Sequence, residues 1–232
     1  MDFQKVTAVA TRRGIFQPAY DAYGGLAGFY DYGPVGVRMR RRILEVWRKH
    51  YVIGAGCLEL DGALVGPEAL FQASGHLGEF DDALVDCPDC GKQFRADHLV
   101  NSGEDVSREA LARAVSKAAC PNCGSALSEL KAFNLMFSTS VGSSKGASGY
   151  LRPETAQSIF LAFPWLLRQN RGKLPFAGSQ IGRSFRNEIS PRQGPLRMRE
   201  FTQMEVEHFF LPNDEPELSG SLENVTMPEN EI

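Results

Sequence analysis

Residues 182–188 read GRSFRNE and residues 197–210 read RMREFTQMEVEHFF, and these two stretches decide the fold of the chain. They lie in strand-like patterns that extend over about 176–188 and about 197–210. The segment between them contains two prolines and a glycine, which favour a turn. We therefore predict an antiparallel hairpin with a long polar loop.

One face of this hairpin is charged. Because side chains alternate along a strand, Arg186 and Glu188 are expected on the same side of the first strand. On the second strand the shared face carries Arg197, Arg199, Phe201, Gln203, Glu205 and Glu207. An apolar core cannot accept such a face, so it is either solvated or a ligand site. Arginines pair with phosphate oxygens and a phenyl ring stacks on a base, so the ligand that fits this face is a nucleotide.

A second group of residues lies upstream, where residues 149–157 read GYLRPETAQ. The pattern predicts a helix from Thr155 to Asn170, and we expect Pro164 to kink or split it. Glu154 lies near the helix start, where the helix dipole stabilises an acid. Two interpretations of Glu154 stay open, a helix cap and a part of the ligand site.

The rest of the chain predicts further elements by its periodicity and its turn residues. We expect an irregular glycine-rich segment at 14–36, helices at 37–52 and 107–119, strands at 57–65 and 133–141, and a loop at 142–149. Basic residues gather at 38–49 and again at 183–199. Each of these two clusters is either a solvated face or a local surface for a polyanion.

Four of the five cysteines form two knuckles, CPDCG at 87–91 and CPNCG at 120–124. Two pairs of thiolates suit a tetrahedral Zn²⁺ in a closed structural site, so the predicted ligands are Cys87, Cys90, Cys120 and Cys123. The alternatives are four unrelated cysteines or a redox pair. The fifth, Cys57, is expected to be a buried thiol of a strand.

The composition excludes several classes of protein. The chain has 232 residues, a net charge of −3, 43% hydrophobic and 23% charged residues, which is typical of a globular protein and not of a disordered one. There is no run of about 20 apolar residues that would predict a membrane span. The first residues lack the apolar core of a secretory signal, so we expect a cytoplasmic protein without a membrane partner.

Six sequence words, taken together, resemble one family. They are YGGLAGFYDYGPV at 23–35, SGHL at 74–77, RADHL at 95–99, FNLMF at 133–137, RPETAQ at 152–157 and RNEISPR at 186–192. On these words the chain, from about 11 to 211, resembles the glycyl-tRNA synthetases of the dimeric archaeal, eukaryotic and part-bacterial type. These are class II aminoacyl-tRNA synthetases, and FRNE at 185–188 resembles motif 2 of that class.

The resemblance implies an α+β fold, in which the antiparallel class II sheet is flanked by helices and carries a small zinc-binding insert. It implies four parts: residues 1–86 with motif 1, the insert at 87–123, the catalytic core with motif 2 at 124–211, and an acidic tail at 212–232 that begins a truncated insert. Motif 1 comprises the helix near 37–52 and the strand ending at Pro67, and it implies a homodimer.

The resemblance also implies a site for ATP, glycine and the acceptor end of tRNA(Gly). Its catalytic residues are Arg186, which contacts the α-phosphate, and Glu188. The implied ATP-binding residues are Arg186, Asn187, Glu188, Arg197, Met198 and Phe201, with Phe201 stacked on adenine. The implied glycine-binding residues are Arg95, Glu154, Gln203 and Glu205. Mg²⁺ accompanies ATP, and the loop at 189–196 meets the tRNA.

The function implied by the resemblance is activation of glycine with ATP to glycyl-adenylate, followed by transfer to tRNA(Gly). Motif 3 and the anticodon-binding domain of the family are not found in the 232 residues. We therefore expect a truncated catalytic domain with reduced activity. The alternative is a non-catalytic module that binds ATP or RNA and retains the synthetase fold.

Overall fold

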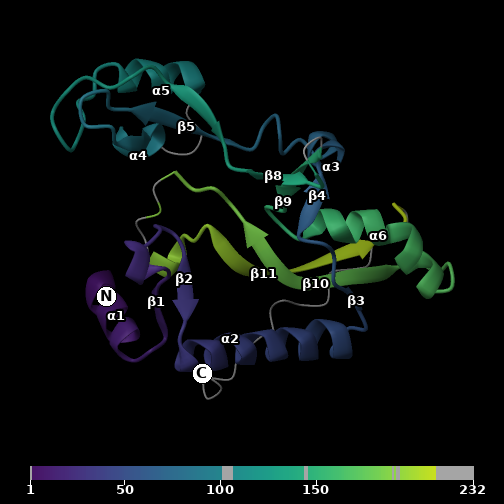
Figure 1. Ribbon diagram of the computed structural model, residues 1–232. Coiled ribbons are helices and arrows are strands. Elements are labelled where there is room, and N and C mark those ends of the chain that lie inside the picture. Colours follow the sequence, from purple (N-terminus) through teal and green to yellow (C-terminus); the bar gives the residue numbers. More distant parts are fainter. Residues whose placement is uncertain (1, 101–106, 144–145, 190, 192–193, 213–232) are drawn as a thin grey trace.

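The expected hairpin is present in the computed structural model, which describes residues 2–100, 107–143, 146–189, 191 and 194–212 (Figure 1). Strand β10 (Phe176–Phe185) pairs antiparallel with β11 (Glu200–Phe209) over ten residues of each. Strand β3 (Leu58–Leu60) pairs in parallel with the other edge of β10. The prediction of a hairpin is therefore confirmed, and the fold is α+β.

Both hairpin strands end earlier at the loop side than the sequence pattern indicates. Because β10 ends at Phe185 and β11 begins at Glu200, the residues at 186–188 and 197–199 leave the ladder. Alternation along a ladder no longer applies to these residues, although Arg186, Glu188, Arg197 and Phe201 line one cavity, as a shared face predicts. The reason is a tertiary contact, since the N–H of Arg199 donates to the carbonyl of Gly28 at 2.8 Å and the N–H of Arg186 donates to that of Arg199 at 3.0 Å.

Helix α6 (Ala156–Gln169) covers one face of the hairpin. It buries Ile159 and Leu166, and an aromatic group of Phe163, Phe176 and Phe209 joins it to the strands with ring centroids 4.9–5.9 Å apart. Of the expected kink or split at Pro164, the split does not occur, because one helix continues through this residue. Pro164 lies on the exposed side, where water can satisfy the carbonyl that loses its N–H partner.

Two predicted strands are each divided in the structure. The stretch 57–65 contributes β3 and the start of β4 (Val65–Pro67), and 133–141 contributes part of β7 (Lys131–Asn134) and all of β8 (Phe137–Val141). The second break follows from Asn134, whose side-chain oxygen accepts from the N–H of Met136 at 2.9 Å and forms a local turn.

The expected loop at 142–149 is partly wrong. Strand β9 (Ala147–Leu151) begins inside it and pairs antiparallel with β8 and β4. Two glycines allow this tight reversal, because Gly142 has φ +93° and a Cβ at Gly146 would collide with the carbonyl of Val141. Residues 144–145 lie outside the described residues.

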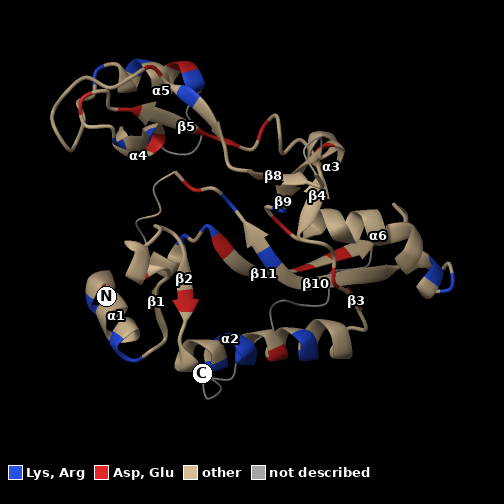
Figure 2. Ribbon diagram, in the orientation of Figure 1, with Lys and Arg blue, Asp and Glu red and all other residues tan. Residues whose placement is uncertain are grey.

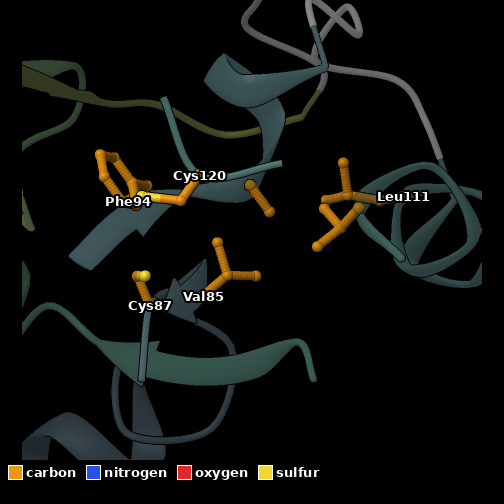
Figure 3. Close-up of a cluster of buried hydrophobic side chains, with 7 residues drawn as sticks. Val85, Cys87, Phe94, Leu111 and Cys120 are labelled. Carbon is orange, nitrogen blue, oxygen red and sulfur yellow. The ribbon is translucent and has the colours of Figure 1, made fainter. Parts of the chain in front are cut away.

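The cysteine knuckles belong to a unit with its own sheet and core. Strand β5 (Asp81–Asp86) lies between β6 (Gln93–Arg95) and β7, and helices α4 (Ala96–Leu99) and α5 (Arg108–Val115) complete the unit. Figure 3 shows its core of Val85, Cys87, Phe94, Leu111 and Cys120. In Figure 1 this unit lies at the upper left, apart from α2 and α6.

The amino-terminal part is more regular than expected. Helix α1 (Phe3–Arg12) was not predicted, although Asp2 caps it by accepting from Gln4 N at 3.1 Å. Within the segment expected to be irregular, β1 (Phe16–Pro18) pairs antiparallel with β2 (Tyr30–Tyr32), and a short 3-10 turn (Asp21–Tyr23) lies between them.

Helix α2 (Pro34–Trp47) confirms the predicted helix, but it begins three residues earlier, with Pro34 in its first turn. A π-helical stretch (Arg48–Gly54) continues it, and Arg48 forms a two-pronged ion pair with Glu59 at 2.6 and 2.8 Å. Helix α3 (Glu68–Ala73) follows β4. Within the part of the chain that the structure describes, no helix is long and apolar enough to cross a membrane.

Candidate functional site

A cavity of about 300 Å³ opens where the hairpin strands leave their ladder. Its lining residues are Arg186, Glu188, Pro195, Leu196, Arg197, Met198 and Phe201. Five of the six residues that the resemblance assigns to ATP line this cavity. The sixth, Asn187, follows Arg186 in the chain, and its N–H donates to the carbonyl of Leu135 at 2.8 Å.

Arg186 lies between two aromatic rings. Its guanidinium carbon is 5.5 Å from the ring centroid of Phe201 and 5.5 Å from that of Phe80. Its Nε also donates to the carbonyl of Pro153 at 3.2 Å. Cation–π contacts on both sides hold a positive charge at the cavity in a fixed place. An anion that enters this cavity meets a guanidinium that is already oriented.

Arg199 does not line the cavity, but it holds the chain on both sides of it through backbone contacts. Arg199 Nε and Nη2 donate to the carbonyl of Glu188 at 3.0 and 2.7 Å, and its Nη1 donates to that of Ala27 at 3.0 Å. Burial lowers the pKa of Arg199, and this guanidinium is used to fix the loop ends. The buried carboxylate of Glu188 lies 3.7 Å from Arg197 Nε, which is the cationic group facing the cavity on that side.

The loop expected to meet tRNA at 189–196 is described only in part. Residues 190, 192 and 193 lie outside the described residues, and Gly194–Leu196 form a 3-10 turn (η3). The tail expected at 212–232 likewise lies outside the described residues after position 212.

Three carboxylates lie near the start of α6, and they belong to Glu154, Glu205 and Glu207. Pro153, whose carbonyl accepts from Arg186, directly precedes the first of them. Glu205 accepts from the N–H of Thr155 at 2.8 Å, and from the Thr155 hydroxyl, and Gln203 Nε2 donates to its other oxygen at 2.9 Å. Glu205 therefore caps the helix across the fold. Figure 2 shows acidic residues along β11, the strand that carries this residue.

Glu154 takes no part in that capping contact. Its Oε1 accepts from Gln157 Nε2 at 2.5 Å and lies 3.4 Å from His76 Nε2. Thr155 is the residue at which the helix starts, and its N–H is bonded to Glu205. The backbone of the helix start is thus bonded to Glu205, whereas the contacts of Glu154 are with the side chains of Gln157 and His76, and its place in a ligand site stays a prediction.

The third carboxylate is Glu207, which was noted on the strand face and was not assigned to the site. Burial raises its pKa, and repulsion from Glu205 and Glu154 adds to that rise. The coupling means that the three acids share one region of negative potential. An ammonium group is the ligand feature that such a region favours.

Arg152 is a buried residue beside these acids, and it interacts electrostatically with Glu205. It donates from Nε to the carbonyl of Arg183 at 2.8 Å and from Nη1 to that of Gly62 at 2.9 Å. Burial lowers its pKa, while Asp61 and Glu205 oppose that effect. A side chain at Gly182 would collide with its guanidinium, so this glycine of the GRSFRNE stretch makes room for it.

Arg95, which the resemblance assigns to glycine, is already paired in the structure. It donates to both oxygens of Asp97 at 3.1 and 2.7 Å and lies 2.9 Å from Asp82. The hydrogen bonds to Asp97 raise the pKa of Arg95, and the charges of Asp82, Asp97 and Glu188 act in the same direction. Arg95 is therefore bound to the acids of the cysteine unit, and it lies neither among the cavity lining nor in the group of Glu154, Gln203 and Glu205.

The four cysteines of the knuckles come together, as the spacing predicts. Their sulfur atoms all lie within 4.8 Å of one another, with Cys87 and Cys123 at 3.4 Å and Cys90 and Cys120 at 3.7 Å. Tetrahedral Zn²⁺ with bonds of about 2.3 Å needs sulfur atoms about 3.8 Å apart, so the set fits a metal ion. Hydrogen bonds from Ser125 lower the pKa of Cys123 to about 6, which favours the thiolate.

Sequence reasoning missed four contributors to the site: His76, Phe80, Arg152 and Glu207. Alternation with Glu205 was a usable signal for Glu207. The others act through contacts between segments far apart in the chain, which no local pattern reveals.

Comparisons with known proteins found one matching family model and several similar sequences. The tRNA synthetase class II core domain (G, H, P, S and T) matches residues 137–227. The glycine–tRNA ligase of Methanothrix thermoacetophila is 49% identical over 91% of this chain, and those of Methanocaldococcus jannaschii and Aeropyrum pernix are 46% and 44% identical over 90% and 92%. The chain spans 38% of the length of each of these three relatives.

Solved structures show the same fold. Prolyl-tRNA synthetase from Cryptosporidium parvum, complexed with L-proline and AMP, is similar with a TM-score of 0.54 over 90% of this chain and 29% of its own, at 12% identity. The RNA binding domain of threonyl-tRNA synthetase from Cryptosporidium parvum Iowa II is similar with a TM-score of 0.50 over 81% of this chain and 33% of its own, at 18% identity. This chain is therefore a homologue of part of the glycine–tRNA ligases, and it has the class II tRNA synthetase core fold.

Proposed function

We propose that this chain binds glycine and ATP and joins them as glycyl-adenylate, the first step in charging tRNA(Gly). The observation that carries the proposal is one arrangement of side chains. A guanidinium held between two rings faces a cavity, and three coupled carboxylates lie beside it at the start of α6. The cavity suits a nucleotide, and the carboxylates suit a small ammonium compound.

The acids provide the basis for amino-acid recognition. Glycine offers an ammonium group and no side chain, so the site must hold the ammonium and exclude larger competitors. We assign the ammonium to Glu154 and Glu205, with Gln203 orienting Glu205. Glu207 adds negative potential to the same region. Every other amino acid is larger, so steric exclusion is an effective filter.

The cavity residues provide the basis for nucleotide recognition. We assign the α-phosphate to Arg186, the adenine ring to Phe201, and the rest of the nucleotide to Asn187, Glu188, Arg197 and Met198. In the ligand-free chain the guanidinium of Arg186 lies over Phe201. Phe201 also lines the cavity, so we propose that its ring is the surface on which the base stacks.

The reaction then needs position and charge, and no protein nucleophile. A carboxylate oxygen of glycine attacks the α-phosphorus, the bond to the bridging oxygen breaks, and pyrophosphate leaves with that electron pair. Arg186 stabilises the negative charge that develops on the α-phosphate. Mg²⁺ bound with ATP supplies further charge neutralisation when it is present. We assign Arg95 to the approach of the substrates, beside Glu188.

The metal at the knuckles is proposed to be Zn²⁺ in a structural role. Four thiolates complete its coordination, which leaves no open position for a reacting water. The cysteines lie in a unit with its own hydrophobic core, so the metal stabilises that unit. In our proposed division of the chain the insert is 87–123, between the parts at 1–86 and 124–211, and the cysteine unit extends beyond both ends of this insert through β5 and β7.

A second copy of the chain is proposed to cover helix α2. The helix exposes an apolar stripe at helical spacing, which comprises Val35, Met39, Ile43, Val46 and Ile53. Basic residues share the helix surface (Figure 2). A stripe of this length fits the homodimer expected from motif 1. We further propose tRNA(Gly) as the acceptor and the cytoplasm as the compartment.

The test is glycine-dependent exchange of pyrophosphate into ATP, measured on the 232-residue chain with alanine and serine as controls. Exchange with glycine alone supports the proposal. A folded chain that binds ATP without any exchange supports the alternative of a binding module. A chain that binds neither ATP nor glycine refutes both.

A further inference from the structure

The segment from Ser74 to Phe80 touches both groups of the candidate site. It follows helix α3 and turns back at Gly75, which has φ +80°. Its backbone is folded on itself, since Leu77 N donates to the carbonyl of Phe71 at 3.2 Å and Glu79 N to that of Gly75 at 2.9 Å. It also lines a cavity of about 190 Å³.

At one end of the segment, His76 meets the carboxylate of Glu154. The ring nitrogen Nε2 lies 3.4 Å from Glu154 Oε1, and Nδ1 lies 2.9 Å from the hydroxyl of Ser74. When the hydroxyl donates to Nδ1, the neutral ring carries its proton on Nε2 and directs it to Glu154. The His76 side chain is only 12% exposed, so the contact is shielded from solvent.

At the other end, Phe80 meets the guanidinium of Arg186. The guanidinium carbon is 5.5 Å from its ring centroid. The rings of His76 and Phe80 are themselves in contact, with centroids 5.4 Å apart at 60°. The two ends of the segment are thus joined to one another as well as to the site.

The end of strand β7 and the residue that follows it fix the segment in place. Asn134 Nδ2 donates to the carbonyls of His76 and Leu77 at 2.9 and 3.2 Å, and Leu135 N donates to the carbonyl of Phe80 at 3.0 Å. These bonds hold both ends of the segment. A side chain on such a backbone can orient its neighbour at little entropic cost.

From these contacts we infer that His76 and Phe80 are positioning residues, which act on the two substrates separately. His76 orients the carboxylate of Glu154 for the ammonium of glycine, and Phe80 orients the guanidinium of Arg186 for the phosphate of ATP. The inference rests on the proposed function. It adds to that function two residues that make no contact with substrate and act through Glu154 and Arg186.

The test compares the dissociation constants of ATP and of glycine between two variants, each of which should affect only one of the two ligands. We propose titrating the 232-residue chain with ATP by calorimetry and with ¹³C-glycine by NMR, for the wild type, His76→Ala and Phe80→Leu. His76→Ala is expected to weaken glycine binding about tenfold and leave ATP binding unchanged, since the contact that orients the charged Glu154 is lost. Phe80→Leu is expected to weaken ATP about threefold and leave glycine unchanged, since one cation–π contact is lost.

Conservative variants separate positioning from general damage. His76→Gln keeps an N–H donor for Glu154 and Phe80→Tyr keeps the ring, so each should recover most of its lost affinity. If His76→Ala fails to fold, Ser74→Ala replaces it, because it removes only the bond to Nδ1 and should weaken glycine alone. Phe163→Leu is the matched control, since it disturbs a distant aromatic group and should leave both affinities unchanged.

The outcomes are distinct. The inference is overturned if either variant lowers the affinities for ATP and glycine equally, or lowers neither. In that case binding of both ligands to the wild type still supports the proposed function. A folded wild-type chain that binds neither ligand overturns the proposed function, and the inference falls with it.

Discussion

The carboxylate of Glu205 accepts a hydrogen bond from the N–H of Thr155, the residue at which helix α6 starts. The two residues are 50 positions apart in the chain. A strand of the hairpin therefore supplies the cap of the helix that covers it. The cap places the negative charge of Glu205 at the positive end of the helix dipole.

Glu205 thus has two roles that a pair of variants separates. Glu205→Ala should lose about 1 kcal/mol of unfolding free energy, because the helix start loses its acceptor. Glu205→Gln should lose less, since its amide oxygen can still accept from Thr155. Both should weaken glycine about tenfold, because the charge that attracts the ammonium is gone. Urea unfolding and a glycine titration measure the two effects, and wild-type glycine affinity in Glu205→Gln would remove Glu205 from the amino-acid site.

Arg186 is expected to be essential for the exchange reaction. Arg186→Ala removes the guanidinium that faces the cavity, and exchange should fall by a factor of about one hundred or more. Arg183→Ala is the matched control, because Arg183 lies in β10, three residues before Arg186, and forms a half-exposed ion pair with Glu200 at 3.2 Å. Exchange in Arg183→Ala should remain near the wild-type rate. Unchanged exchange in Arg186→Ala would contradict the catalytic assignment.

The hairpin was predictable because its signal is local. Alternation along β10 and β11 and the turn residues between them lie within one stretch of sequence. The ends of the strands were not predictable, since they depend on Arg199 and its contacts with Ala27 and Gly28. A residue 172 positions away decides where the ladder stops.

The candidate site also has parts that local sequence predicts and parts that it does not. The cysteine cluster follows from spacing alone, because each knuckle fixes two sulfur atoms and the unit closes around them. The contact between His76 and Glu154 joins the turn after α3 to the segment between β9 and α6, so no periodicity in the sequence indicates it. The missed helix α1 is a different case, since Asp2 was a visible cap signal in the sequence.

Removal of the metal should unfold the cysteine unit selectively. The hydrophobic core that surrounds Cys87 and Cys120 belongs to this unit, whereas α6 and the hairpin share another. A chelator should therefore raise hydrogen exchange in β5, β6 and α5 and leave the hairpin protected. Uniform loss of protection would show that the metal stabilises the whole chain. Cys57→Ser serves as the control, because Cys57 lies outside the cluster and should leave metal content unchanged.

Glu207 should make the stability of the chain fall as pH rises. Burial and the charges of Glu205 and Glu154 raise its pKa in the folded state, so the folded chain holds this proton more tightly than the unfolded chain. As pH rises from the ordinary carboxyl pKa through the raised one, the folded state loses that advantage. Above the raised pKa the ionised Glu207 is a net cost to the fold.

Glu207→Gln removes that cost, so its unfolding free energy should exceed the wild-type value more at about pH 7 than at about pH 4. Urea unfolding of both proteins at the two pH values measures the difference. Glu129→Gln makes the same charge change at an exposed position of the cysteine unit, and its difference from the wild type should stay constant. A constant difference for Glu207→Gln as well would show that the three carboxylates are not coupled. The pH dependence therefore reports the burial of Glu207 together with its repulsion from Glu205 and Glu154, the two acids to which the ammonium of glycine is assigned.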